Sequence, residues 1–147
     1  MPINMVKLPT SRKDLYFRVA KGHFATSRSH TNYYIDITVQ KTRLSEATAL
    51  AQEFVEMYRY KAPVDTILDG TEVIGTCIAN EMTRMELANM NLHQTVYIVT
   101  PEHTSGSQLI FRENILPMIK GKNVLILAAS VVTGFTARGA VEAVKYY

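Results

Sequence analysis

The sequence predicts an α/β domain with a mainly parallel sheet that is flanked by helices. Segments typical of strands alternate with segments typical of helices along most of the chain, as in right-handed βαβ crossovers. The run Asn123–Ala129 is apolar throughout most of its length, as expected for a parallel strand that is buried on both faces. The length of 147 residues fits a single domain over residues 1–147 with one core.

The first half of the chain predicts a helix, a strand and a second helix. The first helix is expected over residues 11–22, where Ser11 can cap it and apolar residues recur at helical spacing. Residues 33–39 are rich in β-branched and aromatic types, which favours a strand. Residues 45–60 predict the second helix, because apolar side chains recur at spacings of three and four.

The second half predicts strand, helix, strand, loop, strand and helix. These elements cover residues 64–70, 71–88, 94–100, 101–123, 123–129 and 137–145. The loop contains Gly106 and is expected to be flexible or a hairpin. The chain stops directly after a helix, and that helix follows a strand whose apolar run is typical of the centre of a sheet. We therefore expect one edge of the sheet to be missing. Either the native chain continues past Tyr147 or a partner covers that edge.

The composition is that of a globular protein, since 47% of the residues are hydrophobic and 20% are charged. No apolar run reaches the roughly 18 residues of a membrane span, and the N-terminus lacks the apolar stretch of a signal peptide. The single cysteine, Cys77, lies in an apolar stretch and is expected in the core rather than as a nucleophile. We therefore expect a cytoplasmic protein that does not associate with membranes.

Charge and histidine spacing give no support for two further classes of site. The formal net charge of +3 is too small to indicate a nucleic-acid partner. The histidines have no spacing typical of metal ligands, so no metal site is expected among the protein's own side chains. They are His23, His30, His93 and His103.

The strongest functional signal lies between residues 124 and 144. A buried strand leads into a turn of small residues around Gly134, and a helix begins at once. The first backbone N–H groups of a helix have no intrahelical partner, and the helix dipole favours an anion there. The turn, Val132, Thr133, Gly134, Phe135, Thr136 and Ala137, is therefore predicted to hold a phosphate group. The alternative is an ordinary helix with a threonine as its N-cap.

A second strand runs into Gly70, Thr71 and Glu72 before the next helix. Backbone groups of this loop could contact a second anionic group, and Gly75 would allow tight packing. Two such loops at one edge of a parallel sheet would form a cleft for two phosphates. The alternative is a plain connection between a strand and a helix.

A third cluster precedes the strand predicted over residues 33–39. Aromatic rings beside a guanidinium group suit a flat anionic ring, and the alternative is a surface turn beside core aromatics. The cluster consists of His23, Phe24, Arg28, His30, Tyr33 and Tyr34.

Together, in this order, the three segments resemble the orotate phosphoribosyltransferases of the type I phosphoribosyltransferase fold. GHFATSRSHTNYYID resembles the family's N-terminal GHF…TSGRxSxxYID segment. DGTEVIGTCIA resembles its pyrophosphate loop, GxExGGIxxA. NVLILAASVVTGFTARGAVEAV resembles its phosphoribosyl-diphosphate motif, VLVVEDVVTTGGSxxEAI. The resemblance runs from about Lys21 to the C-terminus.

The resemblance implies transfer of ribose 5-phosphate from phosphoribosyl diphosphate to orotate, with Mg²⁺ on the diphosphate and a homodimer as the usual assembly. Residues 132–137 would hold the 5-phosphate, and residues 70–72 would face the diphosphate. Phe24, Tyr33 and Tyr34 would lie near the base, and Arg138 matches an arginine that contacts the orotate carboxylate in some members.

Two departures from the family pattern leave two hypotheses open. The adjacent acidic pair that holds the ribose hydroxyls is replaced by Ala128 and Ala129. Residues 100–109 carry no Lys or Arg, so His103 is the only candidate for a catalytic cation in the mobile loop. The protein is then either a transferase or a non-catalytic module that senses a nucleotide, phosphoribosyl diphosphate or another anion. A structural subunit of an active paralogue is a third alternative.

Overall fold

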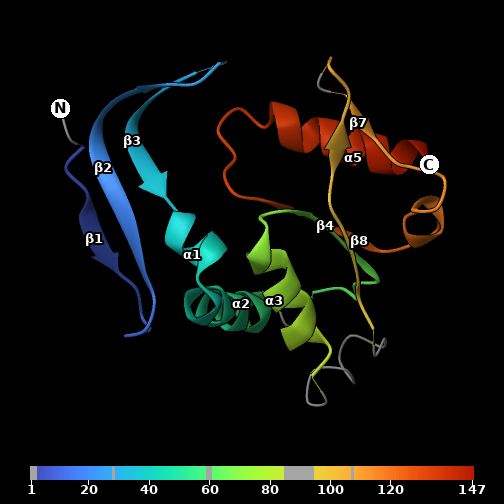
Figure 1. Ribbon diagram of the computed structural model, residues 1–147, viewed down its shortest axis with the longest axis horizontal. Coiled ribbons are helices and arrows are strands. Elements are labelled where there is room, and N and C mark those ends of the chain that lie inside the picture. The colour runs from blue at the N-terminus through green and yellow to red at the C-terminus, as the bar shows by residue number, and fades with distance from the viewer. Residues whose placement is uncertain (1–2, 28, 59–60, 85–94, 107) are drawn as a thin grey trace.

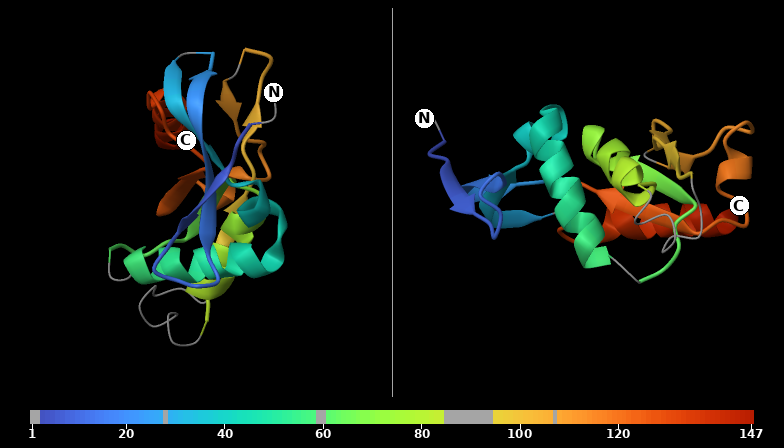
Figure 2. Two further views of the ribbon diagram at one scale, coloured as in Figure 1. Left: turned by 90° about the vertical axis from the view of Figure 1, so that its left-hand side faces the viewer. Right: turned by 90° about the horizontal axis from the view of Figure 1, so that it is seen from below.

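A computed structural model describes residues 3–27, 29–58, 61–84, 95–106 and 108–147, which form a mixed α/β fold (Figure 1). The α/β part of the predicted class is confirmed. The sheet is not mainly parallel, however, because a small parallel sheet is accompanied by a three-stranded antiparallel sheet and a short hairpin. The molecule is elongated, with the antiparallel sheet at one end and the parallel sheet toward the other (Figure 2).

The antiparallel sheet has the order β1-β2-β3. Its strands are β1 Val6–Pro9, β2 Tyr16–Ala25 and β3 His30–Asp36. The helix predicted over residues 11–22 is therefore wrong. The segment also contains aromatic residues and Val19, which favour a strand, and β2 pairs with a strand on each side. Pairing between distant segments decided between the two patterns.

Two helices follow β3. The strand predicted over residues 33–39 ends early, at Asp36. The amide and the hydroxyl of Thr38 donate hydrogen bonds to Asp36 Oδ1 at 2.9 Å and 2.6 Å. These bonds turn the chain. The short helix α1, Thr38–Thr42, begins there. Helix α2, Leu44–Tyr58, confirms the helix predicted over residues 45–60 as far as Tyr58, and residues 59 and 60 lie outside the described residues.

The parallel sheet has the order β5-β4-β8 and confirms the three strands predicted in the second half, although the one predicted over residues 94–100 is shorter and residue 94 lies outside the described residues. They are β4 Thr66–Gly70, β5 Tyr97–Val99 and β8 Val124–Ala128. Helix α3, Val73–Met82, follows β4, and helix α5, Phe135–Tyr146, follows β8. Residues 85–88 of the predicted helix 71–88 lie outside the described residues.

The segment between β5 and β8 contains a hairpin. Of the two alternatives predicted for residues 101–123, a flexible loop or a hairpin, the hairpin is therefore observed. Strands β6 Glu102–His103 and β7 Leu109–Ile110 pair antiparallel. A 3₁₀ turn, η1 Leu116–Met118, then leads toward β8. The Thr66 hydroxyl donates to the Met118 carbonyl at 2.5 Å and links this turn to the start of β4.

Side chains from both faces of β4 build two apolar clusters. Ile67 packs with α2 and α3 on one face, and its fully buried side chain lies among residues such as Ala51 and Ile78. Leu68 points to the other face and packs with Phe111 and Ile119, close to α5. The alternation follows from the period of two along a strand. Helices thus cover both faces of the central strand (Figure 1).

Strand β8 is apolar like a central strand, yet in the described part of the chain it pairs only with β4. Its residues Val124–Leu127 are half-buried. Among the described helices, none is long and apolar enough to cross a membrane.

Candidate functional site

The two predicted anion loops leave the same edge of the parallel sheet. Strands β4 and β8 are parallel neighbours, and Gly70 at the end of β4 lies opposite Ala128 at the end of β8. Helix α3 begins three residues after Gly70, and α5 begins seven residues after Ala128. Their N-termini therefore follow the carboxyl ends of adjacent strands, where open α/β sheets bind ligands.

The loop from β8 to α5 turns through Gly134, whose φ of 79° and ψ of 0° lie in the left-handed region. A β-carbon at Gly134 would meet no atom within 4 Å, so the backbone conformation and not the space demands glycine. Gly134 is the N-cap of α5. The alternative expectation of a threonine N-cap is therefore wrong, although Thr133 Oγ1 accepts the Phe135 amide at 3.4 Å.

The start of α5 offers backbone donors to the solvent. The first intrahelical bond runs from the Arg138 amide to the Gly134 carbonyl at 2.8 Å. In the part of the chain that the structure describes, the amides of Thr136 and Ala137 have no hydrogen-bond partner. Because Thr133 and Thr136 are exposed, the loop is not folded into the core. These donors and the helix dipole create a positive potential.

The loop from β4 to α3 is organised by the buried carboxylate of Asp69. Its Oδ1 accepts the amide of Thr71 at 2.7 Å and the hydroxyl of Thr71 at 2.5 Å. A β-carbon at Gly75 would lie only 2.1 Å from the carboxylate carbon, so Gly75 makes room for Asp69. A β-carbon at Gly70 would lie 2.9 Å from the Leu127 carbonyl oxygen of β8. Both glycines are therefore required by packing inside the protein.

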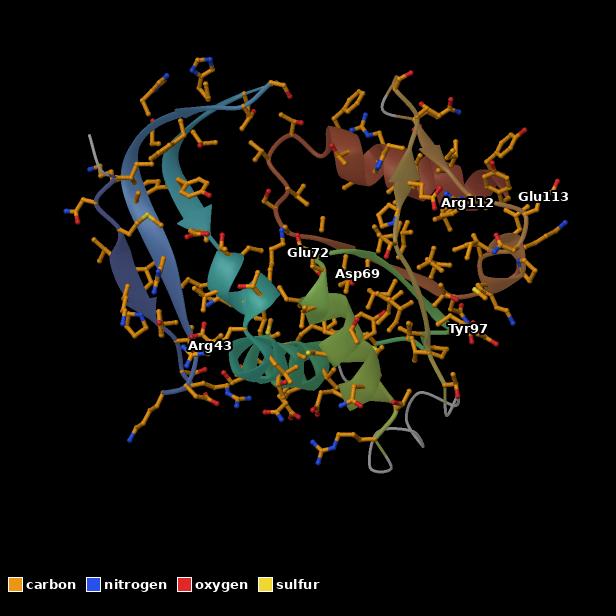
Figure 3. All side chains as sticks on the ribbon, in the orientation of Figure 1. Arg43, Asp69, Glu72, Tyr97, Arg112 and Glu113 are labelled. Atoms are coloured by element: carbon orange, nitrogen blue, oxygen red, sulfur yellow. The ribbon has the colours of Figure 1, made fainter. Side chains whose placement is uncertain are left out.

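Glu72 adopts φ 57° and ψ −121°, a conformation that side chains rarely adopt, and it is the N-cap of α3. Its carboxylate pairs with Lys41 Nζ on α1 at 2.9 Å. The amides of Glu72 and Val73 have no partner among the described residues. The loop therefore presents two backbone donors beside a lysine, with Asp69 and Glu72 close to the end of β4 (Figure 3).

The predicted base-binding residues are only partly brought together. The rings of Phe24 and Tyr34 lie 5.6 Å apart. Tyr33 pairs with Lys21 and Tyr34 with Ala20, so the two tyrosines point to opposite faces of the antiparallel sheet. Arg138 is exposed on α5, and no hydrogen bond or ring contact in the described ranges joins it to Phe24 or Tyr34. Arg28 lies outside the described residues.

Sequence reasoning missed two cations that the structure places in ion pairs, Lys41 and Arg112. Lys41 is far from Glu72 in the sequence, and no motif connects them. Arg112 lies just beyond residues 100–109, and its Nε pairs with Glu102 Oε2 at 2.9 Å across the hairpin. His103 is exposed on β6 of the same hairpin. Arg112 therefore follows the hairpin and is ion-paired with Glu102, the residue before His103.

The residues at this edge do not fit a protein-held Mg²⁺. Ala128 and Ala129 supply no side-chain oxygen, and the carboxylates of Asp69 and Glu72 are bound by Thr71 and Lys41. Among the described residues, no group of three or more His, Cys, Asp or Glu side chains could hold a metal ion.

No protein-family model matches this chain, and no curated protein matches it. The resemblance of three sequence segments to a known family therefore stays a prediction. What the structure adds is their geometry: two glycine-containing loops at one edge of a parallel sheet, each followed by a helix of at least ten residues.

Proposed function

We propose that this chain is an orotate phosphoribosyltransferase-like protein that binds phosphoribosyl diphosphate or a nucleotide at the carboxyl edge of its parallel sheet. One observation supports the proposal above all: helices α3 and α5 follow adjacent parallel strands whose ends, Gly70 and Ala128, lie opposite each other. Residues 132–137 then hold the 5-phosphate, and residues 70–72 face the diphosphate. The finer fold, that of the type I phosphoribosyltransferases, belongs to this proposal.

The same proposal includes the acceptor, the metal ion, the assembly and the location of the protein. The acceptor is orotate, held near Phe24, Tyr34 and Arg138, and the product is a pyrimidine nucleotide. Mg²⁺ enters with the diphosphate. The protein works as a homodimer in the cytoplasm.

A second candidate is a non-catalytic binding module on the same fold, and the exposed Ala128 and Ala129 at the end of β8 favour it. Methyl groups cannot accept hydrogen bonds from ribose hydroxyls. Each hydroxyl left unpaired in a closed site costs about 1–3 kcal/mol. If the hydroxyls are held in the transition state, their loss lowers the rate by several powers of ten, because a tenfold change in rate corresponds to about 1.4 kcal/mol.

Calorimetric titration tests the shared part of both candidates. The ligands are phosphoribosyl diphosphate, a pyrimidine nucleoside monophosphate and inorganic phosphate. Gly134→Ala should weaken binding of the phosphorylated ligands about tenfold or more, because alanine resists the conformation that aims the loop amides. The matched control is Gly121→Ala, since Gly121 has a similar φ of 69° and equally open surroundings.

Equal affinities in the two variants would contradict the proposed phosphate site. Absence of heat with all three ligands in the wild-type chain would contradict both candidates and favour the structural-subunit hypothesis.

Orotate consumption in the presence of phosphoribosyl diphosphate and Mg²⁺ separates the two candidates. Turnover near the ordinary range of about 1–1,000 s⁻¹ would exclude the non-catalytic module. Binding without turnover would favour it. The double substitution Ala128→Glu with Ala129→Asp should then raise affinity for phosphoribosyl diphosphate, while it should leave affinity for inorganic phosphate unchanged.

A further inference from the structure

The β2–β3 hairpin brings together two histidines that their sequence spacing did not connect. His23 Nε2 and His30 Nδ1 lie 2.8 Å apart, and the ring centroids are 4.8 Å apart with 50° between the ring planes. His30 pairs with Ala25 across the strands, which makes His23 its diagonal neighbour. Both side chains are exposed, so solutes reach them.

Backbone and side-chain hydrogen bonds hold this end of the hairpin. The amide of Thr26 donates to the Ser29 carbonyl at 2.7 Å, and the amide of Ser29 donates to Thr26 Oγ1 at 2.9 Å. These bonds fix the two strands next to the histidines. The two imidazoles therefore lie side by side before any ligand arrives, which lowers the entropic cost of binding.

We propose that His23 and His30 form a two-imidazole site for a divalent late transition-metal ion, with Cu²⁺ preferred. At metal–nitrogen distances of about 2.0 Å, two nitrogens at a right angle lie about 2.8 Å apart. Tetrahedral coordination would need about 3.3 Å. The spacing thus suits the square-planar geometry of Cu²⁺ and Ni²⁺ better than the tetrahedral geometry of Zn²⁺, and affinity is highest for Cu²⁺.

Metal binding replaces the hydrogen bond between the rings. In that bond one facing nitrogen donates its proton to the other's lone pair. The donor ring transfers this proton to its outer nitrogen through exchange with water, and both rings rotate until their lone pairs converge. Two nitrogen–metal bonds form, two metal-bound waters leave, and no net proton is released from neutral rings.

The site is open to further ligands. No cluster of three or more potential ligands exists in the described ranges, so the protein supplies two and water occupies the other positions. The inference is independent of the proposed phosphate site, because neither histidine belongs to residues 70–72 or 132–137.

The test is a titration of the full, tag-free chain with Cu²⁺ at about pH 8, at which ordinary imidazoles are neutral, in a weakly chelating buffer. Electron paramagnetic resonance should show one ion bound by two nitrogens. His23→Gln and His30→Gln should each weaken this binding at least about tenfold, because one arm of the chelate is lost. The control His103→Gln, another exposed strand histidine, should bind as the wild type does.

Wild-type affinity in either His23→Gln or His30→Gln would overturn the proposal, and tighter binding of Zn²⁺ than Cu²⁺ would overturn the square-planar geometry. Nuclear magnetic resonance of the unmodified chain gives a second measurement that depends on no variant. Substoichiometric Cu²⁺ should broaden the imidazole signals of His23 and His30 before that of His103. Simultaneous broadening of all three signals would also refute the site.

Discussion

The two sheets of this molecule are stabilised in different ways. Residues Thr66–Asp69 of β4 are buried, and apolar clusters cover both faces of that strand. In the strands of the antiparallel sheet, by contrast, only Ala20 is fully buried. The parallel sheet is held by burial of apolar surface, whereas the antiparallel sheet is held mainly by backbone pairing between its own strands.

The antiparallel sheet also exposes apolar side chains. Val6, Val19 and Ile35 lie opposite one another across the three strands and therefore share one face. Val6 is 57% exposed and Ile35 is 60% exposed. Val6 and Ile35 thus bury less apolar surface than Ile67 and Leu68, which helices cover.

The largest expected effect comes from truncating the core of the parallel sheet. Ile67→Ala should lower the free energy of unfolding by about 2–5 kcal/mol, because a fully buried side chain leaves a cavity between β4 and the helices. The matched substitution Ile35→Ala in the antiparallel sheet should change it by no more than about 0.5 kcal/mol. Urea denaturation measures both values, and similar losses would show that the two sheets are not stabilised differently.

A buried glutamine links the two regions. Gln40 on α1 is 1% exposed, and its Nε2 donates to the Tyr16 carbonyl of β2 at 2.8 Å and to Glu46 Oε2 at 2.9 Å. Gln40→Ala should lower stability by about 1–3 kcal/mol, because it leaves a buried carboxylate without this donor. Hydrogen exchange should accelerate in β2 and β3 more than in β4.

The control for this link is Gln52→Ala, since Gln52 is only half-buried and accepts a bond from Arg12 at 3.1 Å. Its effect should be smaller than that of Gln40→Ala. Uniform acceleration of exchange across all strands in the Gln40 variant would show that Gln40 stabilises the whole fold and not this link.

Tight packing at the end of β4 gives a prediction of comparable size. Gly75→Ala should destabilise the protein by about 1–3 kcal/mol, because a β-carbon would overlap the Asp69 carboxylate. Adding Asp69→Ala should restore part of this loss, which a double-mutant cycle measures. Gly139→Ala on α5 is the control: its β-carbon meets no atom within 4 Å, so it should be neutral or stabilising by up to about 1 kcal/mol.

The smallest effect concerns Asp36, where the antiparallel sheet meets α1. The Thr38 hydroxyl, then the Thr38 amide, lower the pKa of Asp36 below its usual value, and Arg18 adds to this. A lowered pKa in the folded state stabilises the fold above the unfolded pKa of about 3.9, and this stability is lost as pH falls through the folded pKa. The contribution should stay below about 1 kcal/mol because solvent screens the group.

Urea midpoints of the wild type and Asp36→Asn should therefore differ at about pH 6 and converge near pH 2. Thr38→Val, which removes the hydroxyl donor, should reduce the difference. A difference that persists at low pH would contradict the role assigned to the Asp36 carboxylate.

Local patterns predicted the parallel half of the fold well and the N-terminal part poorly. The strands and helices from β4 onward follow from runs of apolar residues bounded by glycines. Residues 11–22 gave a helical stripe by coincidence: Leu15, Val19 and Ala20 recur at helical spacing, yet Val19 and Ala20 lie on opposite faces of β2. The His23–His30 pair and the Lys41–Glu72 pair escaped prediction because no sequence spacing encodes contacts across strands or between distant helices.

The sequence alone determined the α/β class, the two loops around Gly70 and Gly134, and the helices that follow them, because each depends on neighbours a few residues away. Only the tertiary structure decided that β8 lies beside β4, that Gly75 accommodates Asp69, and that residues 16–25 form a strand. These features depend on free-energy gains from pairing and packing between distant segments, and local periodicity does not contain them.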